Sequence, residues 1–230
     1  MAKKDQTENV LETVESSLSK TELWIEENRN LLGGVIGAIL VIAAGIWGYQ
    51  KYILEPAEQE AANEIFMAQK YFEQDSLKLA LNGDGQYLGF IDIADEYSNT
   101  KSGNLANYYA GISYLHLGDF ENAISYLDQF DSDDQILSVI AKGAIGDAFL
   151  EINQPEEALE YYEKATQINE NEFVNPIYLQ RAANTADLIG NHKAMLGYLK
   201  TLKEKYPDSR EAIDVDKWIA YAEAEIENHE

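Results

Sequence analysis

The sequence predicts an all-α protein: a single N-terminal transmembrane helix followed by an α-solenoid of about three to four helical hairpins with a C-terminal capping helix. One observation behind this prediction is an uncharged apolar run near the N-terminus that is long enough to cross a bilayer. The other is a period of about 35 residues in the C-terminal two thirds of the chain, which is typical of stacked helical hairpins.

Residues 1–29 are predicted to form a cytosolic tail before the span. Within it, Val10, Leu11, Val14 and Leu18 recur at helical spacing, which indicates a short amphipathic helix. The opposite face of this helix is acidic, whereas helices that lie on lipid usually carry a basic polar face. Docking on another protein, lying on the membrane and a partly ordered tail therefore all stay open.

Residues 30–54 are predicted to form the transmembrane helix. No charged residue lies between Arg29 and Lys51, and about 20 helical residues cover a hydrocarbon core of about 30 Å. Trp47 and Tyr52 lie where an interfacial aromatic belt is expected. The long acidic segment before the run favours a signal anchor over a cleaved signal peptide. A buried core helix is the alternative.

The orientation follows from the basic residues near the span. Lys20 and Arg29 precede it and Lys51 follows it, so the positive-inside rule favours a cytosolic N-terminus. We therefore expect a single-pass protein of the bacterial inner (cytoplasmic) membrane, with residues 55–230 in the periplasm. The chain has no cysteine, which is compatible with an oxidising compartment without requiring one. A reversed topology, with the repeats in the cytosol, is the alternative.

A strip of small residues runs along one side of the predicted span. Small side chains let another helix approach closely in lipid, so we expect this strip to contact either a helix of a partner or a second copy of this chain, as a homo-oligomer would. Its members are Gly33, Gly34, Gly37, Ala38, Val41, Gly45 and Gly48.

The period beyond the span is defined by turn-forming pairs. These are Gly83-Asp84, Gly118-Asp119, Asn153-Gln154 and Gly190-Asn191. Each pair separates two stretches patterned for helix, so the sequence predicts hairpins near 57–100, 104–135, 139–170 and 175–207. The first of these is predicted to be degenerate, because the flanks of Gly83-Asp84 match the pattern poorly. A final amphipathic segment over 209–228 is predicted to cap the array, with a polar outer face.

Two of these hairpins repeat the same residue types in register. Gly111, Tyr114 and Ala123 recur as a small residue, an aromatic residue and Ala 35 residues later. This pattern resembles the tetratricopeptide repeat (TPR), in which small residues stand where two helices cross. In the next hairpin, Asn175 is predicted to cap the first helix ahead of Pro176. The alternative is an unrelated helical array whose glycines fall in phase.

The resemblance to TPR arrays implies a concave groove lined by the first helix of each hairpin, which binds extended peptides or partner helices. The groove positions in this chain are Leu105, Tyr108, Ile112, Leu115, His116, Ile140, Asp147, Leu150, Glu151, Ile177, Gln180, Asn184 and Asp187. The mixture of apolar and acidic groups suits loosely bound, unfolded clients. In the alternative, Tyr108, Ile112 and Leu115 only pack against the upstream hairpin.

Composition excludes other classes of function. With 41 acidic and 17 basic residues, the net charge is −24, and such a field repels nucleic acid. The chain has three histidines and no cysteine, and no nucleophile–base set is suggested, so we predict no enzyme activity and no cofactor. The segment that begins at Asn82 fails the pattern of a calcium-binding loop, because Tyr87 replaces the turn glycine and Ile93 replaces the bidentate glutamate.

The whole layout resembles the YfgM-like family, especially the versions from Bacteroidota. The likeness rests on the order of tail, span and acidic TPR domain, on residues 104–111 and on Tyr206-Pro-Asp-Ser209. It implies an ancillary subunit of the SecYEG translocon that works beside a membrane-anchored periplasmic chaperone called PpiD to receive exported proteins. The alternative is a general cell-envelope TPR scaffold for outer-membrane assembly or division, without translocon contact.

Overall fold

The structure is a computed structural model that describes residues 24–229. The chain divides into two compact units, Met1–Pro56 and Ala57–Glu230, and each is described by itself. All regular elements of the described residues are helices, which confirms the all-α prediction. The amphipathic helix predicted in the tail lies outside the described residues.

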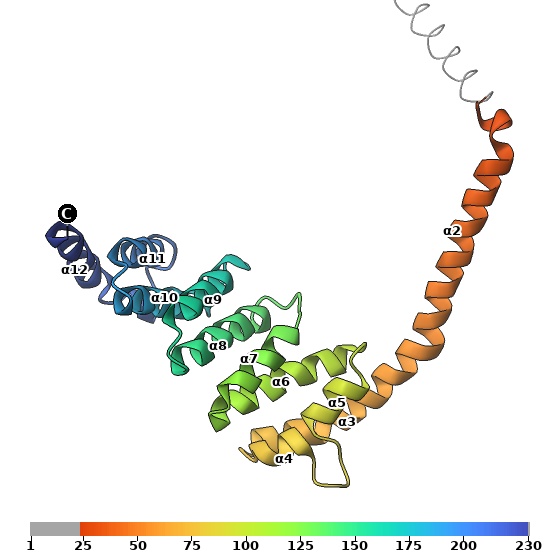
Figure 1. Ribbon diagram of the computed structural model, residues 1–230, viewed down its shortest axis with the longest axis horizontal. Coiled ribbons are helices and arrows are strands. Elements are labelled where there is room, and N and C mark those ends of the chain that lie inside the picture. Colours follow the sequence, from red (N-terminus) through yellow and green to blue (C-terminus); the bar gives the residue numbers. More distant parts are fainter. Residues whose placement is uncertain (1–23, 230) are drawn as a thin grey trace, which may run out of the picture. The chain divides into compact units, whose positions relative to one another are not determined.

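The first unit is dominated by one apolar helix. Helix α2 (Arg29–Tyr49) continues into a short π-helical segment, η1 (Gln50–Leu54), and none of its residues is buried (Figure 1). Within the described residues, this is the one helix whose length and composition would allow it to cross a membrane. At its end the rings of Trp47 and Tyr52 meet edge to face, with centroids 6.2 Å apart.

The second unit opens with three helices rather than one regular hairpin. They are α3 (Glu55–Glu73), α4 (Leu77–Asn82) and α5 (Phe90–Glu96). Their apolar faces meet around the fully buried Phe90 and Ile93, together with Ile65 of α3 and Leu81 of α4. The short α4 and α5 thus complete a core that α3 alone would leave open.

Three regular helical hairpins follow. Their helices are α6 (Lys101–Leu117) and α7 (Phe120–Gln129), α8 (Leu137–Glu151) and α9 (Pro155–Gln167), and α10 (Asn175–Leu188) and α11 (His192–Lys205). Each helix packs on the ones before and after it, so the core runs along the array as a series of linked clusters (Figure 1). This arrangement confirms the predicted solenoid.

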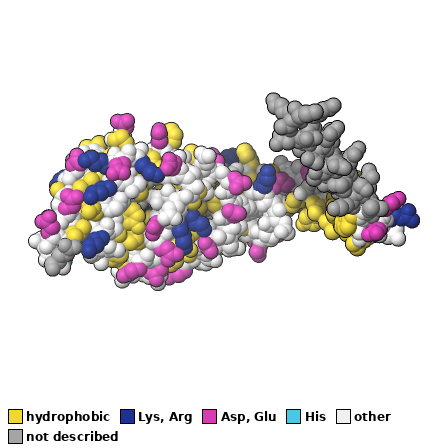
Figure 2. Space-filling model, turned by 90° about the horizontal axis from the view of Figure 1, so that it is seen from above, with side chains coloured by type: hydrophobic (Ala, Val, Ile, Leu, Met, Phe, Trp, Pro, Cys, Tyr) yellow, Lys and Arg dark blue, Asp and Glu magenta, His cyan; other side chains and the backbone are white. Residues whose placement is uncertain are grey.

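The array ends in a 3₁₀ turn, η2 (Arg210–Ala212), and α12 (Val215–Asn228), which buries Val215 and Ala222. The outer face of α12 is less polar than predicted. Trp218 and Tyr221 of α12 are exposed, as is Ile213 just before the helix, at 77%. Elsewhere the surface is rich in acidic side chains, as Figure 2 shows for one face.

The turn residues that define the 35-residue period have left-handed backbone conformations. Gly83, Gly118 and Gly190 have φ angles of 73°, 78° and 70°, and Asn153 has 59°. Glycine adopts such angles without steric penalty and Asn tolerates them better than most residues. In the three regular hairpins, these residues let the chain reverse within two or three residues between the first and second helix.

One predicted helix start is wrong. Asn175 does not cap α10, because Val174 precedes the helix and Asn175 is its first residue. The Asn175 side chain is buried, and its amide donates to the carbonyls of Thr166 (3.2 Å) and Asn169 (2.6 Å). It therefore ties the end of α9 to the start of α10, a role that a local capping rule does not anticipate.

Close helix crossings depend on two glycines. A Cβ at Gly146 would lie 2.6 Å from Cε1 of Tyr162, and one at Gly111 would overlap the Leu127 side chain and lie 3.0 Å from its backbone nitrogen. Contacts this short do not occur in relaxed structures, and overpacked cores respond by shifting backbone. The prediction that small residues mark the crossing points of α6 with α7 and of α8 with α9 agrees with this geometry.

We predict that Gly111→Ala lowers the free energy of unfolding by about 1–3 kcal/mol, because the new methyl group overpacks the α6–α7 crossing. Chemical denaturation followed by circular dichroism measures the change. The matched control is Gly197→Ala in the middle of α11, where a Cβ meets nothing within 4 Å. There we expect stability to rise by about 0.5–1 kcal/mol from helix propensity; equal effects at both sites would contradict the packing argument.

Candidate partner-binding face

The first helices α6, α8 and α10 form one face of the array, which we call the first-helix face. A contact between α8 and α10 defines its centre: Arg181 Nη1 donates to Oδ2 of Asp147, and the Tyr162 hydroxyl donates to Oδ1 of the same carboxylate at 2.7 Å. The Asp147 and Arg181 side chains are 28% and 42% exposed. The pair is therefore held in place and still reachable from solvent.

Aromatic rings fix the position of Arg181. The ring of Tyr178 lies directly over Gly143 of α8, where any Cβ would overlap it. The guanidinium carbon of Arg181 is 5.4 Å from the centre of that ring, within cation–π range. Gly143 thus has a structural role, because it lets α10 approach α8 closely enough for Arg181 to reach Asp147.

Electrostatics keep these groups in one protonation state. Burial, reinforced by the charge of Asp147, raises the pKa of both the Tyr162 and the Tyr178 hydroxyls, so both remain neutral donors. Burial lowers the pKa of the Arg181 guanidinium, but the charge and hydrogen bond of Asp147 outweigh burial and raise it overall. The Asp147–Arg181 contact is therefore flanked by two neutral tyrosines.

Four of the predicted groove residues on α6 serve mainly in packing. Leu105, Tyr108, Ile112 and Leu115 are half-buried against a cluster of α7 and α8 residues. The Tyr108 ring lies 5.2 Å from that of Phe130, centre to centre. Tyr108, Ile112 and Leu115 thus pack on their own second helix and the next hairpin rather than on the upstream hairpin. Leu105 packs on both sides, because it also contacts the upstream cluster around Phe90. Part of each side chain stays accessible.

The other predicted positions divide by exposure. Leu150, Glu151 and Asn184 are exposed, while Ile140 and Ile177 are half-buried. Gln180 reaches the carbonyl of Glu211 from its amide nitrogen at 3.5 Å, and Asp187 lies 3.4 Å from Nε2 of His192. The accessible part of the first-helix face on α8 and α10 therefore combines Leu150, Glu151 and Asn184 with the Asp147–Arg181 pair.

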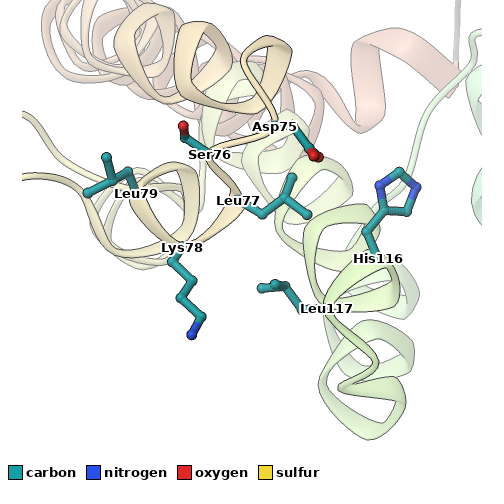
Figure 3. Close-up of a pocket in the computed structure, with 7 residues that line it drawn as sticks. All are labelled: Asp75, Ser76, Leu77, Lys78, Leu79, His116 and Leu117. Atoms are coloured by element: carbon teal, nitrogen blue, oxygen red, sulfur yellow. The ribbon is translucent and has the colours of Figure 1, made fainter.

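His116 lies apart from this pair, in an open cleft of about 810 Å³. Figure 3 shows His116 and Leu117 at the end of α6 on one side of the cleft. The opposite side is formed by residues 75–79, in which Leu77 supplies an apolar floor and Lys78 points outward. The cleft offers an apolar surface edged by His116, Asp75 and Lys78.

Sequence reasoning missed Arg181. The groove positions carried over from the repeat pattern include its neighbour Gln180 but not Arg181 itself. A signal was present, because Asp147 and Arg181 are opposite charges 34 residues apart, close to one repeat. Residues one repeat apart stand on the same face of neighbouring first helices, so opposite charges at that spacing predict a contact between repeats.

The site offers groups that can recognise a polypeptide. Within residues 24–229, no group of three or more His, Asp or Glu side chains is placed to hold a metal ion. The face instead presents an arginine in a fixed position, exposed carboxylates and the edges of aromatic and aliphatic side chains. Such groups bind peptide segments through hydrogen bonds and apolar contact.

Comparison with known proteins agrees with the geometry. Residues 105–133 and 141–172 each match a family model described as tetratricopeptide repeat. The chain contains tetratricopeptide repeats. The matched segments correspond to the hairpins α6–α7 and α8–α9, in which the TPR pattern is clearest. A search of curated proteins gives no match.

Solved structures show the same TPR fold. A putative kinesin light chain with nearly identical TPR-like repeats from Podosopora anserina aligns with a TM-score of 0.54 at 12% identity, covering 74% of this chain and 89% of that chain. A variant of that protein also gives 0.54 at 12% identity, covering 77% and 90%. At this identity, the likeness shows the fold alone.

We predict that Asp147 and Arg181 are energetically coupled by about 1 kcal/mol, because the pair is partly shielded from water and held by Tyr162 and Tyr178. A double-mutant cycle with Asp147→Asn and Arg181→Met, read by chemical denaturation, measures this coupling. The control cycle uses Lys164 and Glu160, an exposed i,i+4 pair on α9, for which we expect a smaller coupling. Equal coupling energies would mean that the Asp147–Arg181 contact contributes no more to stability than an exposed surface pair.

Proposed function

We propose that this protein is a non-enzymatic, membrane-anchored TPR adaptor that serves as an ancillary subunit of the SecYEG translocon. TPR arrays act as adaptors and scaffolds in protein–protein interaction. The resemblance to the YfgM-like family is the reason for naming the translocon as the partner. The observation that carries the adaptor part of the proposal is the Asp147–Arg181 contact. It aligns equivalent faces of two successive first helices, as a continuous binding surface requires.

The anchor is assigned to residues 30–54, with residues 1–29 in the cytosol and 55–230 in the periplasm. The length of α2 and the lack of any buried residue in it support this assignment, as does the positive-inside bias of the sequence. Nothing lies within 4 Å of a Cβ built at Gly33, Gly37 or Gly45. The strip of small residues along α2 is thus available for a helix of the translocon.

The repeats would receive exported proteins and hold them for a chaperone of the PpiD type. Unfolded chains expose apolar side chains and backbone amides, and the first-helix face offers partners for both. Leu150 supplies apolar contact, while Glu151, Asn184 and Arg181 supply hydrogen bonds. Loose, mixed contacts of this kind suit a surface that must release its client.

We predict that the repeats lie outside the inner membrane. The chain has no cysteine, so Ser125→Cys, at an exposed position on α7, creates a unique thiol. A membrane-impermeant maleimide should label this thiol in intact cells with a permeabilised outer membrane. Ala2→Cys in the tail is the control and should label only after lysis. Labelling of Ala2→Cys alone in intact cells would establish the reversed topology.

We predict that tagged full-length protein recovers translocon subunits and a PpiD-type chaperone in mild detergent, and that a form lacking residues 1–54 loses the translocon. Mass spectrometry of the two samples measures this. Leu150→Arg should keep the translocon and lose crosslinks to exported clients, because it changes only the first-helix face. Recovery of an outer-membrane assembly or division complex without translocon subunits would instead support a general envelope scaffold.

A further inference from the structure

The connections between hairpins gather on one side of the second unit. Figure 1 shows the loops α5–α6, α7–α8 and α9–α10 on this side, opposite the short turns within the hairpins. We call this surface the connection edge and define it as residues 97–101, 130–136, 168–174 and 205–209. Neither the predicted groove nor the first-helix face includes its exposed loops.

Hydrogen bonds join the connection edge to the first helices. The Glu58 carboxylate of α3 accepts from the backbone N–H of Lys101 (2.6 Å) and from the Ser102 hydroxyl (2.7 Å). The Asn104 amide donates to the carbonyl of Asp131 (2.6 Å) and accepts the N–H of Asp131 (3.1 Å). The start of α6 is thereby fixed both to α3 and to the following loop.

The same kind of link continues toward the end of the array. The Asn169 amide donates to the carbonyl of Gln135 at 3.0 Å, which joins the α7–α8 loop to the α9–α10 loop. Lys205 Nζ pairs with Glu170 at 2.5 Å, which joins that loop to the end of α11. Successive loops are therefore tied to one another, and the connection edge is a defined surface rather than a set of independent segments.

Large apolar side chains project from this defined surface. Phe173 is 79% exposed, and Ile136 and Ile168 are each 43% exposed. Ile136 and Ile168 directly flank the Gln135–Asn169 hydrogen bond, so they come from adjoining loops. Phe173 belongs to a turn closed by Asn171 Oδ1, which accepts the Phe173 N–H at 2.8 Å. Exposed apolar groups on an ordered surface mark interaction sites.

Two clefts accompany the exposed side chains. One of about 430 Å³ is lined by Leu105, Phe130 and Leu137 together with the acidic loop that follows Phe130. The other, of about 230 Å³, lies between Phe173 and the segment Tyr206–Ser209. Both combine apolar walls with carboxylates, so each can receive an apolar side chain that has a cationic neighbour.

Charge decides which partner fits. Asp131, Asp133, Glu172 and Asp208 are exposed along the connection edge. The edge carries two basic residues against these carboxylates: Lys101, which lines the larger cleft, and Lys205, which is paired with Glu170. Figure 2 views the molecule from above and shows hydrophobic side chains at the surface with acidic and basic ones among them. Anionic lipid and a second copy of this chain, with its net charge of −24, are repelled by such a surface.

We propose that the connection edge is a second docking surface, which binds a basic amphipathic segment of a partner protein. Apolar side chains of the segment pack on Phe173, Ile136 and Ile168 and enter the adjoining clefts, while its Lys and Arg residues pair with the carboxylates around them. One partner can then occupy the connection edge while another occupies the first-helix face.

The test uses the full-length chain in nanodiscs of zwitterionic lipid, with empty nanodiscs as the blank. The probe is a fluorescent 18-residue amphipathic peptide of Lys and Leu, compared by anisotropy with a Glu and Leu peptide of the same pattern. We expect only the Lys peptide to bind. The variant Ile136→Ser with Phe173→Ser should weaken binding about tenfold, because it removes two apolar contacts.

The matched control is Phe66→Ser with Ile213→Ser, which removes side chains that are 65% and 77% exposed on α3 and before α12. It should change binding less than twofold. A third variant, Asp133→Asn with Glu172→Gln, should weaken binding and reduce its dependence on salt. Thermal unfolding verifies that each variant is folded. If Ile136→Ser with Phe173→Ser is unfolded, the binding of the Lys peptide is compared instead between wild-type protein and Phe173→Ser alone.

Several outcomes would overturn the proposal. They are equal binding of the Lys and Glu peptides, an equal loss in the connection-edge and control variants, and no binding of the Lys peptide to wild-type protein. Binding of phosphatidylglycerol vesicles that the connection-edge variant abolishes would identify lipid as the occupant. Self-association in sedimentation velocity that the same variant abolishes would identify a second copy.

Discussion

The array depends on the close approach of helices at positions that carry no Cβ. Gly111 admits Leu127, Gly146 admits Tyr162, and Gly143 admits Tyr178. The first two contacts close a hairpin, and the third joins one hairpin to the next. Dispersion and apolar burial act only at short range, so these three points set the spacing at which the side chains between α6 and α7, α8 and α9, and α8 and α10 meet. The Asp147–Arg181 contact is one consequence of that spacing.

Much of the fold could be predicted from the sequence, because it rests on short-range rules that repeat. Left-handed turns at Gly118, Asn153 and Gly190 and the apolar length of α2 are local properties. The first hairpin was harder to predict. There α4 and α5 complete a core around Phe90 through contacts that no period describes. The same limit explains Asn175, whose amide serves carbonyls in the preceding loop instead of capping its own helix.

The candidate site was less predictable than the fold. A repeat pattern assigns positions to a face but does not say how much of each side chain the neighbouring hairpin covers. Tyr108 and Leu115 hold groove positions, yet they are half-buried against α7 and α8. Arg181 falls outside the pattern and reaches the first-helix face through its length and its stacking on Tyr178. The exposed fraction of a side chain and the groups it can contact depend on the residues packed around it, so sequence position alone does not determine them.

The Asp147–Arg181 pair connects the kind of ligand that this face would accept to the stability of the junction between two repeats. In stacked repeats, stability is approximately a sum of terms from each repeat and each junction, and this ion pair belongs to the junction of α8 with α10. A ligand carboxylate that captures Arg181 must first separate it from Asp147, so its binding energy is reduced by the loosening of that junction. A cationic or neutral ligand leaves the junction closed. If clients bind this face as proposed, acidic ligands would be disfavoured by the cost of loosening this junction, in addition to direct charge repulsion.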